Sequence, residues 1–116
     1  RYKEHHTEDA EILLISFGSA ARTTLHMVEQ RRQRGLKVGL LELQTLWPFP
    51  RQLVRRMCKG RTHVLVVEMN MGQVCQEVRK AVIRPERVYL ANRFDGASIA
   101  PADILNVLNM IRGKGV

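Results

Sequence analysis

Polar side chains that could do chemistry gather in Glu68-Met69-Asn70-Met71-Gly72-Gln73, directly after the apolar run Val64–Val67. A glutamate at the end of a strand can act as a general acid or base if it is buried. A catalytic set also needs a nucleophile, a second carboxylate or a histidine, and none is close in sequence. His63 is at the far end of the same run, roughly 15 Å away at about 3.3 Å per residue. We therefore expect Glu68 to bond loop amides, with an interface loop as the functional alternative.

The residues after Glu68 also carry a helix-start signal. Asn70 and Gln73 are three positions apart, which is the spacing of a capping box. That spacing predicts that both side chains cap the helix that follows. Asn70, Gly72 and Gln73 join Glu68 as candidates for a loop that contacts a partner.

A second candidate loop is Asn92-Arg93-Phe94-Asp95-Gly96-Ala97. The guanidinium of Arg93 could hold a carboxylate or a phosphate, because it offers several donors in a fixed fork. It could equally pin the loop by pairing with Glu68 or Asp95. The sequence leaves both roles open.

Motifs for cofactors and metals are weak or missing. Gly18-Ser19 follows an apolar run and could offer free amides to an anion, but neither the GxGxxG nor the Walker pattern is present. A tight turn with Ser19 as the helix cap is the better interpretation. Cys58 and Cys75 form no CxxC pair, so we expect no thiol redox motif and no iron–sulfur or zinc site, but two buried thiols in a reducing cytoplasm.

The segment Leu46-Trp47-Pro48-Phe49-Pro50 concentrates large aromatic rings where regular structure cannot form. Each proline lacks a backbone donor and pushes the preceding residue toward extended geometry. The segment is therefore a stiff connector that carries two rings. Either both rings pack internally, or at least one of Trp47 and Phe49 lies in a contact with another domain.

Alternating strands and helices must position these loops. Short apolar runs predict strands, apolar residues at helical spacing predict helices, and Gly35 and Gly60 are placed to end two of the helices. The strands are expected at Ile12–Phe17, Val38–Leu43, Val64–Val67 and Val88–Leu90, and helices over Ala20–Arg34, from Pro50, through Val74–Ala81 and from Pro101. This order predicts an α/β fold of three αβα layers, with a mostly parallel sheet of four or five strands and helices on both faces. Ligands of such sheets lie beyond the carboxyl ends of the strands, where the loops above belong.

Size and charge bound the remaining possibilities. The 116 residues suit a single domain at 11–116, with residues 1–10 as a polar linker or lead-in. The chain starts at Arg1, which suggests a processed chain or a piece of a longer protein. No apolar run approaches the roughly 20 residues that span a bilayer, so no membrane contact is expected. The net charge of +8 points toward nucleic acid, but lysines and arginines fall near predicted helix ends, where the helix dipole favours cations.

Three stretches together resemble one family: "TEDAEILLISFGSAAR", "GLKVGLLELQTLWPFP" and "VLVVEMNMGQVCQEVRKAV". In this order and spacing they are similar to the C-terminal domain of the α subunit of 2-oxoacid:ferredoxin oxidoreductases, the 2-oxoglutarate type in particular. The resemblance covers residues 7 to 110, and "TLWPFP" and "VVEMN.GQ" are its most specific parts. It also implies the fold of the transketolase C-terminal domain. Two departures are the turn Asn92–Ala97, where the family has small glycine-rich residues, and Ala100, where it has a Ser/Thr cap.

The resemblance implies a division of labour within a larger, cytoplasmic enzyme. The whole enzyme would decarboxylate a 2-oxoacid oxidatively, form acyl-CoA and reduce ferredoxin, using thiamine diphosphate, Mg and iron–sulfur clusters held elsewhere. This domain would be inactive alone and would brace the rest of the α subunit and the β subunit that carries thiamine diphosphate. Two alternatives remain: a stand-alone basic module that binds nucleic acid, and a small nucleotide-binding enzyme of flavodoxin-like type.

Overall fold

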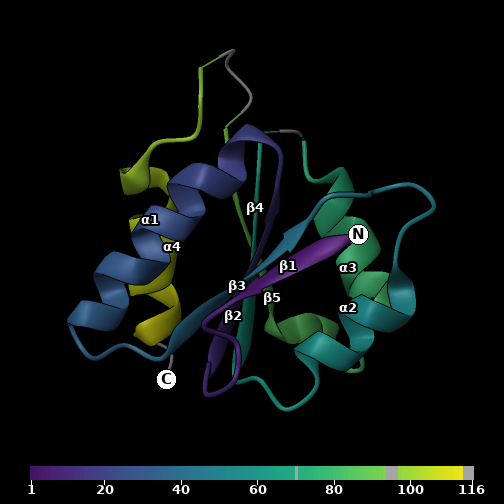
Figure 1. Cartoon of the computed structure of the whole chain (residues 1–116), viewed down its shortest axis with the longest axis horizontal. Helices are drawn as coiled ribbons and strands as arrows, with labels where there is room; N and C mark the ends of the chain where they lie inside the picture. Colours follow the sequence, from purple (N-terminus) through teal and green to yellow (C-terminus); the bar gives the residue numbers. More distant parts are fainter. Residues whose placement is uncertain (70, 94–96, 114–116) are drawn as a thin grey trace.

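A computed structural model describes residues 1–69, 71–93 and 97–113. One sheet of five strands runs through the molecule in the order β1-β3-β2-β4-β5, with α1 and α4 on one face and α2 and α3 on the other (Figure 1). Strands β2 to β5 are parallel, and β1 is antiparallel to β3. The predicted three-layer α/β fold is confirmed. The elements are β1 Tyr2–His5, β2 Ile12–Phe17, α1 Ser19–Gln33, β3 Val38–Leu43, α2 Arg51–Cys58, β4 His63–Glu68, α3 Gln73–Ala81, the 3-10 turn η1 Pro85–Arg87, β5 Val88–Asn92 and α4 Pro101–Arg112.

The central strand β2 divides the apolar residues into two cores. Ile12 and Leu14 face the core covered by α1 and α4, whereas Leu13 and Ile15 face the core covered by α2 and α3. All four side chains are fully buried. Successive side chains of a strand point to opposite faces, so a strand covered on both sides must be apolar throughout. Burying a Leu or Ile side chain stabilises the fold by about 1.5–3 kcal/mol, which makes β2 the anchor of both cores.

Most helix ends lie where the sequence predicts them. Gly35 and Gly60 follow α1 and α2 with φ of 86° and 81°, a conformation that glycine adopts without strain. Helix α4 begins at Pro101 as predicted, and α2 begins at Arg51, one residue after Pro50. The prediction for Ser19 is wrong, because Ser19 is the first residue of α1 and Gly18 is the cap position. The Ser19 hydroxyl donates instead to the Met69 sulfur, 3.5 Å away.

Residues 1–10 are not a linker, contrary to the sequence-based expectation. Tyr2–His5 pairs with β3 along its whole length, from Tyr2 opposite Leu43 to His5 opposite Leu40. The turn that follows is held by two arginines. Arg61 Nη1 donates to the carbonyls of Thr7 (2.8 Å) and Ala10 (2.7 Å). Arg32 Nη2 binds the Asp9 carboxylate at 2.6 Å. A short, polar edge strand has no apolar pattern, so only its pairing with β3 reveals it.

Candidate functional site

Parallel strands bring the loops predicted as candidates to one edge of the sheet, which we call the carboxyl edge. It is formed by Phe17–Ser19, Gln44–Pro50, Glu68–Met69 with Met71 and Gly72, and Asn92–Arg93, at the upper side of the sheet in Figure 1. Strands β2 and β4 are neighbours there, but their following helices α1 and α3 cover opposite faces. Such a switch point is where open α/β sheets bind ligands.

Glu68 ends β4 and is fully buried, yet its carboxylate is occupied by the protein itself. Oε1 accepts a hydrogen bond from the Val74 amide (3.3 Å) and Oε2 accepts one from the Cys75 amide (2.9 Å). These amides belong to the first turn of α3, where no intrahelical partner exists and the helix dipole favours a negative charge. Glu68 therefore joins the end of a strand to the start of a helix. Its two oxygens bond helix amides, where the sequence-based interpretation expected loop amides.

Gln73 does not occupy the third helical position that the predicted capping box requires. Gly72, with φ of 93°, is the cap position of α3, and Gln73 is the first helical residue with no side-chain cap bond. Asn70 lies outside the described residues. Glu68 binds the amides of Val74 and Cys75 in the first turn of α3, so a buried carboxylate supports the start of this helix. A side chain at position 72 would be strained by the positive φ and would meet Leu90 Cδ2 at 3.3 Å.

The two rings of the Trp47–Phe49 segment have different environments. Phe49 packs against the core covered by α2 and α3, as Leu46 and Leu53 do. Trp47 is 62% exposed, with its ring centroid 6.3 Å from that of Phe49. Met71, on the loop before α3, is 74% exposed. The carboxyl edge thus presents two large apolar side chains to solvent, one of them on a segment stiffened by prolines.

Arg93 pairs neither with Glu68 nor with a loop carboxylate in the described part of the chain. Its Nη1 lies 3.5 Å from Asp103 Oδ2, and the same oxygen accepts a hydrogen bond from the Ala100 amide at 2.8 Å. Arg93 thereby ties the end of β5 to the first turn of α4. Asp103 also supports the start of that helix, where Ala100 has no capping oxygen. The alternative partner Asp95, within 94–96, lies outside the described residues.

Sequence reasoning missed the contacts that join β2 to β4 at the switch point. Ser16 is fully buried, and its hydroxyl donates to the Val67 carbonyl at 2.9 Å. Beyond it, the bond from Ser19 to Met69 crosses between the two loops. A single serine inside the apolar run Ile12–Phe17 was the available signal, because a buried hydroxyl needs a partner.

Neither cysteine has the environment of a reactive thiol. Both are buried and free, as predicted. Burial raises the pKa of Cys58 to about 12 and raises the pKa of Cys75 as well. Within the described ranges, no group of three His, Cys, Asp or Glu side chains could hold a metal ion. The described helices include none that is long and apolar enough to cross a membrane.

Comparison with known proteins identifies related chains. Residues 10–104 match the family described as "Pyruvate:ferredoxin oxidoreductase core domain II". The chain is 38% identical, over 98% of its length, to the ketoisovalerate oxidoreductase subunit VorB of Methanothermobacter marburgensis, of which it covers 32%. It is 37% identical, over 91% of its length, to the 2-oxoglutarate synthase subunit KorA of Methanothermobacter thermautotrophicus, of which it covers 28%. The chain thus spans about a third of the length of these relatives.

Two solved structures share the fold. A 2-oxoglutarate:ferredoxin oxidoreductase from Magnetococcus marinus, with 2-oxoglutarate, coenzyme A and succinyl-CoA bound, superposes on 96% of this chain with a TM-score of 0.84, 21% identity and 19% of its own chain covered. A split-gene transketolase, an inactive β4 tetramer, superposes on 96% of this chain with a TM-score of 0.77, 14% identity and 41% of its own chain covered. The predicted likeness to the transketolase fold is confirmed. The nucleic-acid hypothesis gains no support from any of these relatives.

Proposed function

This chain belongs to the pyruvate:ferredoxin oxidoreductase core domain II family, and on that premise we propose that it is an assembly domain of a 2-oxoacid:ferredoxin oxidoreductase. In this proposal the chain is part of a longer α subunit, because the relatives named above are about three times its length. The domain holds other domains in place and performs no chemical step alone. The whole enzyme converts a 2-oxoacid to acyl-CoA and reduces ferredoxin.

One contrast at the carboxyl edge carries the proposal. The described polar groups that could serve catalysis are engaged within the domain: Glu68 binds α3 amides and Arg93 binds Asp103. The apolar side chain of Trp47 is left in solvent. An exposed tryptophan on a stiff segment is typical of an interface anchor, because large rings dominate interface energetics and rigidity lowers the entropy lost on docking.

Thiamine diphosphate, Mg and iron–sulfur clusters are proposed for the whole enzyme and not for this domain. The described residues do not fit thiamine diphosphate, because both oxygens of the buried Glu68 carboxylate already accept hydrogen bonds from backbone amides. They do not fit a cluster either, because Cys58 and Cys75 belong to different helices and both thiols have raised pKa values. The β subunit and the remaining α-subunit domains are the proposed partners that supply the cofactors, with ferredoxin bound by the complex.

Substrate choice belongs, in this proposal, to other domains. The two relatives above differ by name in their acids, ketoisovalerate and 2-oxoglutarate, yet match this chain at 38% and 37% identity. A domain that selected the acid would distinguish them more clearly. A cytoplasmic enzyme agrees with the two free thiols, because disulfides are rare in reducing compartments.

The test uses the native polypeptide that contains this sequence. We would capture it with an antibody to this domain and assay the material with a panel of 2-oxoacids, coenzyme A and a viologen dye. The proposal expects dye reduction that requires both coenzyme A and one particular 2-oxoacid. Omitting coenzyme A from the same sample is the matched control. A captured chain that is alone, near 13.3 kDa and inactive would contradict the proposal.

A further inference from the structure

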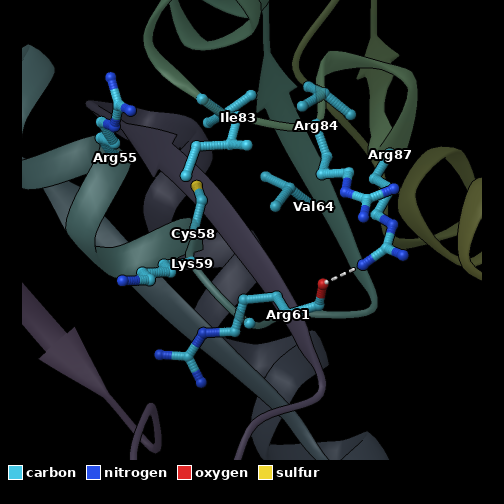
Figure 2. A pocket seen from close by; sticks show the side chains of 11 residues that line it. Arg55, Cys58, Lys59, Arg61, Val64, Ile83, Arg84 and Arg87 are labelled. Carbon is cyan, nitrogen blue, oxygen red and sulfur yellow. Dashed lines mark hydrogen bonds between the residues drawn. The ribbon is translucent and has the colours of Figure 1, made fainter.

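A hollow lies at the opposite edge of the sheet, which we call the amino edge. It has a volume of about 280 Å³ and lies between the last turn of α2, the segment after α3 and the first residues of β4 and β5. Figure 2 shows Arg55, Lys59, Arg61, Arg84 and Arg87 around Cys58 and Val64, with Ile83 at the upper border between Arg55 and Arg84. We call this feature the basic hollow. None of the described residues that line it is acidic.

Few carboxylates pair with the cations of the rim. Arg61 donates to the carbonyls of Met57, Thr7 and Ala10, which orient its guanidinium but leave its positive charge in place. Arg87 Nη1 likewise donates to the Arg61 carbonyl at 3.3 Å. Arg84 has one exposed carboxylate, Glu86, at 3.7 Å. Among the described residues, no carboxylate pairs with Arg55 or Lys59. Five cations around one hollow therefore attract an anion.

The floor of the basic hollow is apolar. Val64 and Val88 are buried at the starts of their strands, while Ile83 remains 58% exposed. A purely ionic ligand would leave this isoleucine in water. An occupant with an aliphatic group flanked by negative charges would cover Ile83 and satisfy the rim together.

We propose that the basic hollow binds an acidic peptide segment of a neighbouring domain or subunit, with carboxylates on the arginine rim and an aliphatic side chain against Ile83. Clusters of arginine recognise acidic motifs in this way. The volume of about 280 Å³ suits one or two side chains and falls below the size of most small-molecule sites. No aromatic ring among the lining residues could stack on a nucleic-acid base.

The test is a titration of the 116-residue chain with the blocked peptide Ac-Glu-Glu-Leu-Glu-Asp-NH₂, followed by amide chemical shifts in NMR. We expect shift changes confined to the lining of the basic hollow. The double variant Arg55→Gln/Arg84→Gln should weaken binding about tenfold, from two ion pairs of at most about 1 kcal/mol each. Arg56→Gln is the matched control, because Arg56 precedes Cys58 on the same helix, is also exposed, and does not line the hollow. The control should bind as the unchanged chain does.

Peptide variants separate the occupant proposed here from other anions. Replacing the leucine of the peptide by serine should weaken binding several-fold, and Ile83→Ser in the protein should abolish that difference. Equal binding of the leucine and serine peptides would overturn the proposal, as would an unchanged affinity in the arginine double variant. An oligonucleotide of equal charge that binds more tightly at the same residues would overturn it as well. None of these results depends on the activity of the whole enzyme. Failure of the peptide-binding proposal can therefore be distinguished from failure of the proposed function, which the viologen dye assay tests.

Discussion

The two edges of the sheet use charge in opposite ways. At the carboxyl edge, a buried carboxylate, Glu68, meets the amides of a helix start, and exposed apolar side chains remain. At the amino edge, the last turns of three helices carry Arg31 and Arg32, Arg55 and Arg56, and Arg79 and Lys80. Both patterns follow from the helix dipole, which favours anions at helix starts and cations at helix ends.

Topology turns this local preference into a property of the molecule. In a parallel α/β fold, each helix runs antiparallel to the strands on which it packs. The C-terminal ends of the helices therefore lie at the amino edge. Cations that suit single helix ends thereby accumulate on one side. Some of them then bind carbonyls, as Arg32 does with Val38 (2.7 Å) and Arg79 with Val88 (2.9 Å). The high positive charge thus has a structural origin, and the basic hollow is where it concentrates.

The largest effect should come from Glu68 at the carboxyl edge. Glu68→Ala leaves the Val74 and Cys75 amides buried without acceptors, at about 1–3 kcal/mol each, so we expect the free energy of unfolding to fall by about 3 kcal/mol. Glu68→Gln keeps one acceptor oxygen and should lose about half as much. Urea denaturation of the 116-residue chain measures both. Glu8→Ala, at an exposed glutamate, is the control. A loss below about 1 kcal/mol in Glu68→Ala would remove the proposed role of the carboxylate.

Trp47 and Phe49 should separate assembly from folding. Trp47→Ala should weaken assembly of the native enzyme by about 2 kcal/mol while changing the free energy of unfolding by less than about 0.5 kcal/mol, since the ring is mostly exposed. Phe49→Ala should mainly destabilise the fold, because its ring packs on the core. Size-exclusion chromatography of the complex and urea denaturation of the chain give the two numbers. Equal losses in both measurements for Trp47→Ala would contradict an interface role.

Cys58 should make the amino edge sensitive to alkaline pH. Burial raises the pKa of Cys58 from 9.0 to about 12 in the folded state. The contribution of the protonated thiol to stability is therefore complete when the pH is below the unfolded pKa, and it is lost as the pH rises toward the folded pKa. Between about pH 8 and about pH 10.5 we expect a loss of about 2 kcal/mol from this thiol. The pH dependence of unfolding in Cys58→Ala should be smaller by that amount. Identical pH dependence in both chains would show that the thiol does not titrate as described.

The smallest effect should be at Asp9, an exposed residue of the amino edge. The hydrogen bond from Arg32 lowers the pKa of the Asp9 carboxyl below 3.8. Because the pKa is lower in the folded state, the ionised carboxyl stabilises the fold when the pH is above its unfolded pKa. This contribution to stability is lost as the pH falls through the folded pKa. In Arg32→Gln we expect the Asp9 pKa to rise toward 3.8, measured from its carboxyl carbon shift in NMR. Arg34→Gln, an exposed neighbour, should leave it unchanged.

Much of the fold could be predicted because its signals are local. Apolar runs such as Ile12–Phe17 predict buried strands, since a strand covered on both faces has no polar side. Gly35 and Gly60 predict helix ends, since left-handed backbone suits glycine. The separation of Glu68 from His63 along one strand already argued against a catalytic pair. For the Trp47–Phe49 segment the sequence left two possibilities open, and the structure packs Phe49 against the core and leaves Trp47 mostly exposed.

The sequence by itself determined the layers, the edge where the loops gather and the absence of cofactor motifs, because these depend on residue type and spacing along the chain. Tertiary structure alone decided which partners the polar groups take. Glu68 binds the first turn of α3, Arg93 binds Asp103, and Arg32 and Arg61 draw residues 7–10 onto the domain. Each of these bonds joins groups that fold topology brings together, and spacing along the chain does not choose among the candidate partners. The pairing of Tyr2–His5 with β3 is of the same kind, since a polar edge strand is defined only by its neighbour.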